Sequence, residues 1–337
     1  MKAVVLHEKG GPEKLRIEEV PTPEPGPGEV RVKLQASALN RRDYWITIGM
    51  YPGMQFPSIA GSDGAGVIDA IGAGVDGGQI GREVVIYPAR AWGDREDTFG
   101  PDFRVLGMPD QGTFAEYICV PATDVCPRPG HLSWEQAAAV PLAGLTSWRA
   151  AVTHGEVKEG MRVLVTGAGS GVSTFAILWC VHMGAEVWVT SGSNEKIDKA
   201  KGIGAKGGSN YRDADCYKEL RSLSGGFDMV IDSAGGDALN AVLDTLNPAG
   251  RYVFFGSTLG NPAAGLEMAK LFFRHIRIQG TTMGSPAEFR DMIDFVRKHK
   301  IEPVVDRVLP IDHAVEAHKL LEDFSQTGKV VLRNSTE

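Results

Sequence analysis

The chain has 337 residues, which is more than one compact core usually holds, so we expect two domains. Hydrophobic residues make up 43% and charged residues 23%, as in ordinary globular proteins, and the formal net charge of −7 argues against nucleic acid or an anionic membrane surface as a partner. No apolar run reaches the roughly 18 residues of a membrane-spanning helix. The four cysteines lack C-x-x-C spacing, which indicates neither a zinc knuckle nor a redox dithiol. We therefore expect a cytoplasmic protein.

Residues 1–125 are expected to be rich in β-strands. The segments 30–34 and 83–87 alternate or cluster β-branched residues, and the proline-rich segment 21–28 separates such runs. Strands and helices do not alternate regularly in this part of the sequence, which predicts a barrel-like or sandwich-like domain.

From about residue 130 the pattern changes to alternating strands and helices. The expected strands are 162–166, 186–190, 209–211, 228–232, 251–255 and 276–280. Six such strands predict an α/β fold with a doubly wound, six-stranded parallel sheet. Two amphipathic helices at 286–299 and 312–324, and a last strand at 329–332, lie beyond the sixth strand and are expected to rejoin the first domain. The predicted domains are therefore 1–125 with 285–337, and 126–284.

The most informative motif is the glycine-rich turn that follows the strand at 162–166. Gly167 and Gly169 match the first two glycines of a G-x-G-x-x-G fingerprint, whereas Val172 stands at the position of the third. A helix and a further strand complete a βαβ unit of about 30 residues. This arrangement points backbone N–H groups and a helix N-terminus at a pyrophosphate, although a glycine-rich turn without a ligand is the alternative.

Several stretches together resemble the medium-chain dehydrogenase/reductase superfamily, and within it the zinc-independent quinone oxidoreductase and enoyl reductase branch. These stretches are 39–43, 61–66, 112–117, 141–148, 167–173 and 328–332. The resemblance covers essentially the whole length. It implies a GroES-like, β-rich catalytic domain joined to a Rossmann domain that binds NAD(P).

The chain differs from the zinc alcohol dehydrogenases of that superfamily at three positions. Where those relatives have Cys, His and Cys, this chain has Asn40, Ser62 and Leu142. A catalytic zinc needs about three strong protein ligands, which amide, hydroxyl and alkyl side chains do not provide. The segment 88–111, where such relatives carry a four-cysteine zinc lobe, has no cysteine. We therefore predict that the protein binds no metal.

The end of the second strand predicts NADPH in preference to NADH. An NAD-binding sequence usually places Asp or Glu there, but this chain has Thr190 and Ser191. Hydroxyl groups and a nearby ammonium suit the 2′-phosphate of NADPH. The resemblance supports Ser191, Ser193 and Lys196 in this role and Tyr211 on the adenosine side. The alternatives are a helix N-cap for Ser193 and a solvated surface lysine for Lys196.

Other cofactor contacts are expected around the turn and at the carboxyl ends of later strands. On the pyrophosphate side they are Gly167, Gly169, Ser170, Gly171 and Val172. A second set is expected either to face the nicotinamide or to contact the cofactor because it lies in the stretches that match the family. This set is Thr146, Ser233, Gly256, Ser257, Thr258, Thr281, Met283 and Lys329. Ordinary loop turns rich in glycine and serine are the alternative for the loop residues.

The catalytic candidates follow from the charge that hydride transfer creates. Reduction of a quinone or an enone builds negative charge on oxygen, and without a metal a hydrogen-bond donor must stabilise it. Asn40 offers such a donor, and Tyr44 or Tyr51 offers a proton. Asp43 is a further candidate, with a structural role beside Arg41 or Arg42 as the alternative. Asp63 is expected to be a structural turn residue, with a role as a base as the alternative.

The sequence thus predicts an NADPH-dependent, zinc-independent oxidoreductase that acts on a small electrophilic molecule, a quinone or an α,β-unsaturated carbonyl. One alternative is an NAD(P)-dependent alcohol or aldehyde dehydrogenase of the same superfamily, and another is a non-catalytic NADPH-binding protein. The resemblance also implies a homodimer, with the strand at 277–280 as an edge that extends the sheet across a two-fold axis.

Overall fold

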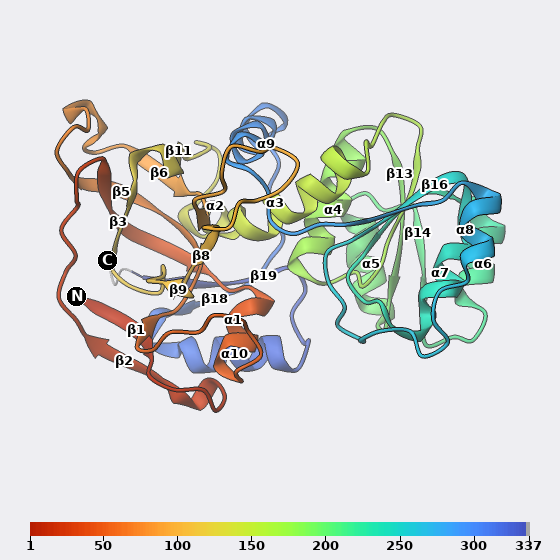
Figure 1. Cartoon of the computed structure of the whole chain (residues 1–337), viewed down its shortest axis with the longest axis horizontal. Helices are drawn as coiled ribbons and strands as arrows, with labels where there is room; N and C mark the ends of the chain where they lie inside the picture. Colours follow the sequence, from red (N-terminus) through yellow and green to blue (C-terminus); the bar gives the residue numbers. More distant parts are fainter. Residues whose placement is uncertain (335–337) are drawn as a thin grey trace. The chain divides into compact units, whose positions relative to one another are not determined.

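The computed structural model describes residues 1–334 and divides into two compact units (Figure 1). The first comprises residues 1–143 and 285–334, and the second comprises residues 144–284. The sequence placed the first boundary at residue 125 instead. The difference arises because helix α2 (Trp134–Ala139) packs against strands β3 (Glu29–Ala38) and β5 (Asp63–Ile71) and so belongs to the first unit.

The remaining elements of the first unit are mostly short. Its other strands are β1 Lys2–Leu6, β2 Leu15–Glu19, β4 Ser58–Ile59, β6 Glu83–Ile86, β7 Ala89–Arg90, β8 Arg104–Leu106, β9 Pro109–Asp110, β10 Tyr117–Pro121, β11 Val125–Pro127, β18 Val305–Pro310 and β19 Lys329–Arg333. Its other helices are α1 Arg41–Thr47, α9 Pro286–His299 and α10 Ala314–Glu322, and α3 Pro141–Trp148 begins in it.

The second unit alternates strands and helices. Its strands are β12 Arg162–Val165, β13 Glu186–Ser191, β14 Gly207–Asn210, β15 Phe227–Asp232, β16 Leu246–Phe254 and β17 Arg277–Gly280. Its helices are the π-helical turn η4 Arg149–His154, then α4 Gly171–His182, α5 Asn194–Gly202, α6 Cys216–Ser224, α7 Leu239–Asp244 and α8 Met268–Arg274.

Strand β3 organises the first unit. One of its edges pairs antiparallel with β5 along most of its length, while the other pairs with β10 in its first half and with β19 at its end. In the part of the chain that the structure describes, these strands belong to a seven-stranded sheet with β6, β11 and β18. Alternate residues Val30, Val32 and Leu34 of β3 are buried in its core. This is the β-rich domain that the sequence predicted.

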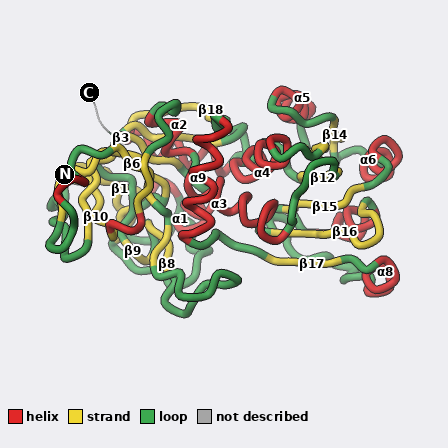
Figure 2. Tube along the Cα trace, turned by 90° about the horizontal axis from the view of Figure 1, so that it is seen from above, coloured by secondary structure: helices red, strands yellow, loops and turns green. Residues whose placement is uncertain are grey.

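The second unit confirms the predicted parallel sheet. Over residues 144–284, six parallel strands follow the order β14-β13-β12-β15-β16-β17, and Figure 2 shows β12, β15, β16 and β17 side by side. Successive residues of β12 face opposite cores. Val163 and Val165 pack with α4 and α5, whereas Leu164 packs with α6 and α7. Both faces are covered by helices, as a doubly wound fold requires.

Most element bounds differ little from the predicted ones, although the strand expected at 251–255, β16, begins at Leu246. The third strand, expected at 209–211, lies at Gly207–Asn210, because Gly207 pairs with Trp188 of β13 although two glycines carry no strand signal. The last strand β19 and the helices α9 and α10 join the first unit, where β19 pairs with β3. Among residues 1–334, no helix has both the length and the apolar character needed to cross a membrane.

Candidate active site and cofactor site

The register of three strands brings Asn40, Asp63 and Lys329 together in the first unit. Ala38, the last residue of β3, lies opposite Asp63 at the start of β5 and opposite Val331 of β19. Asn40 follows β3 by two residues, and Lys329 precedes Val331 by two. Three segments that are far apart in the sequence therefore place their polar side chains at one end of the sheet.

These three side chains form a closed set of hydrogen bonds. The Lys329 ammonium donates to Asn40 Oδ1 at 2.6 Å and to Asp63 Oδ2 at 2.9 Å. The Asn40 amide donates through Nδ2 to the same Asp63 oxygen at 2.9 Å. The side chains of Lys329 and Asp63 are 2% and 0% exposed. A buried cation and a buried anion thus neutralise each other across the amide.

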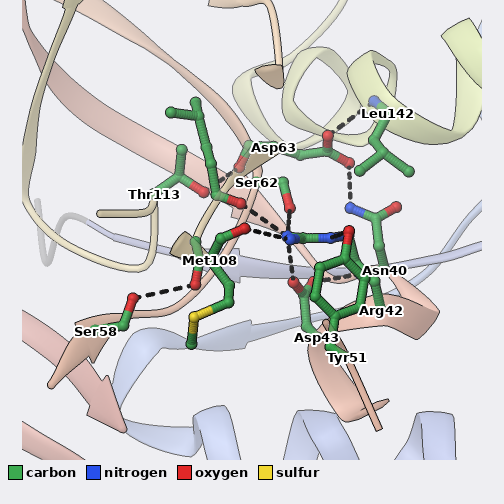
Figure 3. A network of polar contacts seen from close by, with 12 residues as sticks. Asn40, Arg42, Asp43, Tyr51, Ser58, Ser62, Asp63, Met108, Thr113 and Leu142 are labelled. Atoms are coloured by element: carbon green, nitrogen blue, oxygen red, sulfur yellow. Dashed lines mark hydrogen bonds and ion pairs between the residues drawn. The ribbon is translucent and has the colours of Figure 1, made fainter. Parts of the chain in front are cut away.

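The Asp63 carboxylate also fixes the start of helix α3. Its second oxygen, Oδ1, accepts a hydrogen bond from the backbone N–H of Leu142 at 2.8 Å. Leu142 lies in the first turn of α3, where the N–H groups have no partner within the helix and where negative charge is favourable. Asp63 therefore joins β5 to α1, α3 and β19, as the drawn contacts in Figure 3 show for Asn40 and Leu142.

Asp43 holds Asn40 from the other side. Its Oδ2 accepts from the backbone N–H of Asn40 at 2.7 Å, which caps the start of helix α1. Its Oδ1 lies 3.7 Å from Arg42 Nη1 and has no hydrogen-bond partner among residues 1–334. Burial raises the pKa of the Asp43 carboxyl to about 6, against the lowering effect of Arg42. The cap on α1 and the contact with Arg42 are the contacts expected if Asp43 has the structural role named as its alternative.

Arg42 is the centre of a second buried cluster, drawn in Figure 3. Its guanidinium donates to Ser62 Oγ at 2.7 Å and to the backbone carbonyls of Leu106 at 2.7 Å and Met108 at 3.0 Å. Its Nε lies 3.3 Å from the hydroxyl of Tyr51, whose ring it also covers. Arg42 thereby ties α1 to the last residue of β8 and to the segment that follows it.

The structure brings three of the four catalytic candidates together and separates the fourth. Asn40, Asp43 and Tyr51 are linked through Arg42. The Tyr44 hydroxyl instead donates to Glu322 on α10 at 2.9 Å, in an exposed contact. The pKa of Tyr44 is raised by burial of its phenol and by the nearby Glu322 carboxylate. Tyr44 therefore lies outside the polar network around Asn40.

Two members of this network were absent from the predicted site. The sequence suggests Arg42 only as one of two possible partners for Asp43, and it favours a turn residue over a base for Asp63. A charged residue inside Gly61-Ser62-Asp63-Gly64, at the start of a buried strand, is the signal that could have identified Asp63 as a buried, paired carboxylate. Lys329 was predicted as a cofactor contact, and the structure places its ammonium in the Asn40 network, so that role stays a prediction.

In the second unit, the predicted strand, glycine turn and helix form as expected. Gly167 and Gly169 have φ angles of +65° and +112°, which favour glycine. Helix α4 begins at Gly171, and the Ser170 hydroxyl caps it by accepting from Ser173 N at 3.1 Å. A Cβ at Gly169 would lie 2.6 Å from Lys196 Cδ, so the lysine stem crosses this turn.

The residues predicted for the adenosine side lie at or just beyond the carboxyl ends of β13 and β14. Ser191 ends β13 and donates to the Ala168 carbonyl at 3.0 Å, which fixes the turn. Ser193 caps α5. The Tyr211 hydroxyl lies against Gly192, 2.6 Å from where a Cβ would stand there. The carboxyl ends of β13 and β14 therefore carry hydroxyl groups and an ammonium, and segment 189–194 has no Asp or Glu.

A buried carboxylate, Asp232, organises the other predicted cofactor loops. It ends β15 and accepts hydrogen bonds from the Thr166 hydroxyl, from Tyr252 Oη at 2.6 Å and from Gly235 N at 2.8 Å. Burial and Asp232 raise the pKa of Tyr252. The Ser233 carbonyl in turn accepts from Thr258 N and Oγ1, both at 3.2 Å.

The remaining predicted cofactor contacts are Gly256, Ser257, Thr281, Met283 and Thr146. Gly256 approaches the Ser233 carbonyl, and Ser257 donates to the Gly260 carbonyl at 2.8 Å. Thr281 follows β17 and donates its N–H to Phe254 O at 2.9 Å. Met283 and Thr146 are buried, the latter within α3. The carboxyl ends of β15, β16 and β17 thus gather most of this set.

No group of three or more His, Cys, Asp or Glu side chains within residues 1–334 is placed to hold a metal ion. The side chains at the three positions compared with zinc relatives are engaged otherwise. Asn40 accepts from an ammonium, Ser62 accepts from a guanidinium, and Leu142 is apolar.

Comparisons with known proteins agree with both units. The family described as "Alcohol dehydrogenase GroES-like domain" matches residues 26–130, and the family described as "Zinc-binding dehydrogenase" matches residues 171–298.

Individual relatives span almost the whole chain. A "Zinc-type alcohol dehydrogenase-like protein YogA" of Leptosphaeria maculans is 38% identical over 94% of this chain and 92% of its own length. A "Quinone oxidoreductase" of Pseudomonas aeruginosa is 29% identical over 96% of both chains. A crystal structure of an "NAD-dependent alcohol dehydrogenase" is 42% identical, with a TM-score of 0.93 over 99% of both chains.

Proposed function

Since the chain belongs to the medium-chain dehydrogenase/reductase superfamily and is an NAD(P)H-dependent oxidoreductase, we propose that it reduces quinones or α,β-unsaturated carbonyls with NADPH and without zinc. The observation that carries this proposal is the buried Lys329–Asn40–Asp63 set, which offers a hydrogen-bond donor where zinc relatives have a metal ligand. The similarity to a quinone oxidoreductase supports the same substrate class.

The residues present do not fit a catalytic zinc. A zinc ion needs about three thiolate, imidazole or carboxylate ligands with lone pairs directed at it. Here the Asn40 oxygen and the Ser62 oxygen accept hydrogen bonds from buried cations, Lys329 and Arg42. A dication placed among these groups would have to displace the buried cations Lys329 and Arg42 from these hydrogen bonds and from their carboxylate partners Asp63 and Asp43. The proposed reaction therefore uses no metal ion.

The residues of the second unit do fit NADPH. Gly167, Gly169 and the N-terminus of α4 would hold the pyrophosphate, because backbone N–H groups and the helix dipole favour anions. Ser193 and Lys196 would hold the 2′-phosphate, and Tyr211 would contact the adenosine. The loops around Ser233, Gly256–Thr258, Thr281 and Met283, with Thr146, would hold the nicotinamide part.

When bound, NADPH supplies a hydride, and so two electrons, to a carbon of the substrate. The conjugated oxygen then gains negative charge, and the Asn40 N–H donates a hydrogen bond to it. Tyr51 accepts from Arg42, so its own hydrogen remains to protonate the product. Asp43 acts as a positioning residue, because its carboxylate holds the backbone of Asn40.

We also propose that the protein is a homodimer, with no nucleic-acid or membrane partner. Strand β17 ends the six-stranded sheet, and all four of its residues are exposed. Nearby α8 exposes Phe272 and Phe273, at 62% and 77%. An unpaired edge strand beside exposed aromatic side chains suits pairing with a second copy.

The decisive experiment assays the purified protein, after dialysis against EDTA and with its zinc content measured by mass spectrometry. NADPH and NADH are each combined with 1,4-benzoquinone and with 2-cyclohexenone. We expect turnover with NADPH, weaker turnover with NADH and no dependence on zinc. Activity that is lost on chelation and restored by zinc would overturn the proposal.

A second candidate is NAD(P)-dependent oxidation of alcohols, which the names of two similar proteins favour. The same protein is therefore assayed with NAD⁺ and NADP⁺ against primary and secondary alcohols. Alcohol turnover without quinone or enone turnover would select this function. Tight NADPH binding without turnover of any acceptor would select a non-catalytic NADPH-binding protein.

A further inference from the structure

We propose that Lys329 is a positioning residue that orients and polarises the Asn40 amide, so that one amide N–H is presented to the substrate as a strengthened donor. This inference rests on the proposed reductase function. It differs from the role expected for Lys329 as a contact of the cofactor. The evidence is the closed set of contacts among Lys329, Asn40 and Asp63.

Hydrogen-bond chemistry leaves the Asn40 amide only one orientation. An ammonium only donates and an ionised carboxylate only accepts. The amide oxygen must therefore face Lys329, and the amide nitrogen must face Asp63, as the distances of 2.6 Å and 2.9 Å show. A flipped amide would set its N–H₂ against the ammonium and its oxygen against the carboxylate. Lys329 and Asp63 thus act together to fix the direction of Nδ2.

One amide hydrogen remains for a ligand. Nδ2 carries two hydrogens, and the bond to Asp63 uses one of them. The second has no partner among residues 1–334, although the Asn40 residue as a whole is only 6% exposed. A nearly buried donor with one unused hydrogen in a rigid frame is the preorganised group that stabilises developing negative charge.

The ammonium also strengthens this donor. A positive charge bonded to the amide oxygen draws electron density from the nitrogen, which makes the N–H groups more polar. Because Lys329 and Asp63 are almost fully buried, water screens the ammonium little. The Asp63 charge opposes the effect, but its second oxygen is already shared with the Leu142 N–H.

The same contacts argue against Lys329 as a phosphate ligand. Its Nζ makes two short hydrogen bonds within the first unit, and its side chain is 2% exposed. Movement of the ammonium to a phosphate would leave the Asp63 carboxylate buried without its cation, which is strongly unfavourable. A phosphate ligand and a positioning residue predict different effects on the Kd of NADPH and on kcat, so measurement of both can separate the two roles.

The test compares variants that remove the charge pair as a whole. Lys329→Met alone would leave Asp63 as an unpaired buried carboxylate, so the main variant is Lys329→Met/Asp63→Asn. We expect kcat to fall about 10- to 100-fold, less than the roughly 100- to 1000-fold expected for loss of the donor itself in Asn40→Ala. The Kd of NADPH should change less than about 2-fold. The matched control is Lys2→Met/Asp312→Asn, which removes an exposed Lys–Asp pair of the same unit.

A double-mutant cycle identifies the path of the effect. If Lys329 acts through Asn40, the charge-pair variant lowers kcat in the wild-type background but changes it less than about 2-fold in Asn40→Ala. Lys329→Arg should keep a higher kcat than Lys329→Met/Asp63→Asn, because it keeps the positive charge. Equal losses in both backgrounds, or a raised Kd of NADPH with unchanged kcat, would overturn the proposal.

A spectroscopic readout keeps the proposal testable apart from activity. In a sample labelled with ¹⁵N-asparagine, the side-chain amide signal of Asn40 is assigned by its loss in Asn40→Ala. We expect this signal to move further on Lys329→Met/Asp63→Asn than on Asp63→Asn alone, which changes only the acceptor of Nδ2, and to stay in place in the Lys2→Met/Asp312→Asn control. Equal shifts in the first two variants would overturn the proposed polarisation. Absence of turnover in the wild type, with a moved signal, overturns the reductase function alone.

Discussion

Acid should destabilise this protein through His318, a fully buried histidine of α10. Its Nδ1 lies 2.7 Å from the Ala314 carbonyl, which only accepts, so Nδ1 carries the hydrogen. Its Nε2 has no partner in the described part of the chain, and the ring packs edge-on against Phe114. Protonation would place a charged N–H among apolar groups. Burial accordingly lowers the pKa of His318 to about 4, from an ordinary 6.5.

The pKa difference sets the size and the direction of the effect. The unfolded chain binds a proton at His318 below pH 6.5, whereas the folded protein binds it only below about pH 4. Stability is therefore lost as the pH falls from 6.5 to 4, by about 3 kcal/mol at most. Asp43 acts in the opposite sense, because its raised pKa of about 6 makes the folded state bind a proton first.

Comparison of two proteins at each pH isolates His318 from Asp43 and every other group. Urea unfolding of the wild type and of His318→Leu is followed by circular dichroism at pH 7, 6, 5 and 4, with the exposed His313→Leu as control. At pH 7 we expect the His318→Leu stability within about 1 kcal/mol of the wild type, because one hydrogen bond is lost. Between pH 7 and pH 4, the free energy of unfolding of His318→Leu should rise by about 3 kcal/mol relative to that of the wild type. Parallel stability curves would refute the assignment.

Three further predictions address the other features. Lys196→Ala should raise the Kd of NADPH about 10- to 100-fold and leave the Kd of NADH nearly unchanged, because one charged contact to the 2′-phosphate is lost. Fluorescence titration with both cofactors checks this, and equal changes in the two Kd values would contradict it. Arg42→Met should destabilise the protein by about 3 kcal/mol or more, because Asp43 loses its buried cation and two carbonyls lose their donor; thermal unfolding beside the exposed Arg95→Met tests it. Ile278→Lys should convert dimer to monomer in sedimentation velocity, and a monomeric wild type would remove the dimer proposal.

The sheet of the second unit was predictable because its signal is local. The inner strands β12, β13 and β15 are buried on both faces and are therefore short apolar runs, such as 162–166, followed by a turn and a helix. The glycine turn could be placed for the same reason. Gly167 and Gly169 adopt backbone angles that other residues rarely reach, so their spacing marks the turn in the sequence itself.

The polar network of the first unit was only partly predictable, because it depends on strand register. Asn40 was identified as a donor, but its partners Asp63 and Lys329 are 23 and 289 residues away. They meet because Ala38 of β3 pairs with both β5 and β19, and no local pattern specifies such a pairing. Arg42 was missed as a site residue because nothing in Arg41-Arg42-Asp43 shows which arginine faces inward.

Charge balance explains why an amide suits position 40. Arg42 and Lys329 bring two positive charges into the interior of the first unit, and Asp43 and Asp63 bring two negative charges. Asn40 joins the two pairs, since its backbone N–H binds Asp43 and its side chain binds Asp63 and Lys329.

Other side chains at position 40 would break one of these links. An aspartate would add a third buried carboxylate and would set an acceptor against Asp63. A thiolate would add the same charge, and an aliphatic side chain would leave the Lys329 ammonium with one partner fewer. A primary carboxamide both accepts from an ammonium and donates to a carboxylate, and it still holds one hydrogen for the oxygen of a substrate. The residue that completes the buried charge network is therefore also the residue that is chemically equipped to act on the substrate.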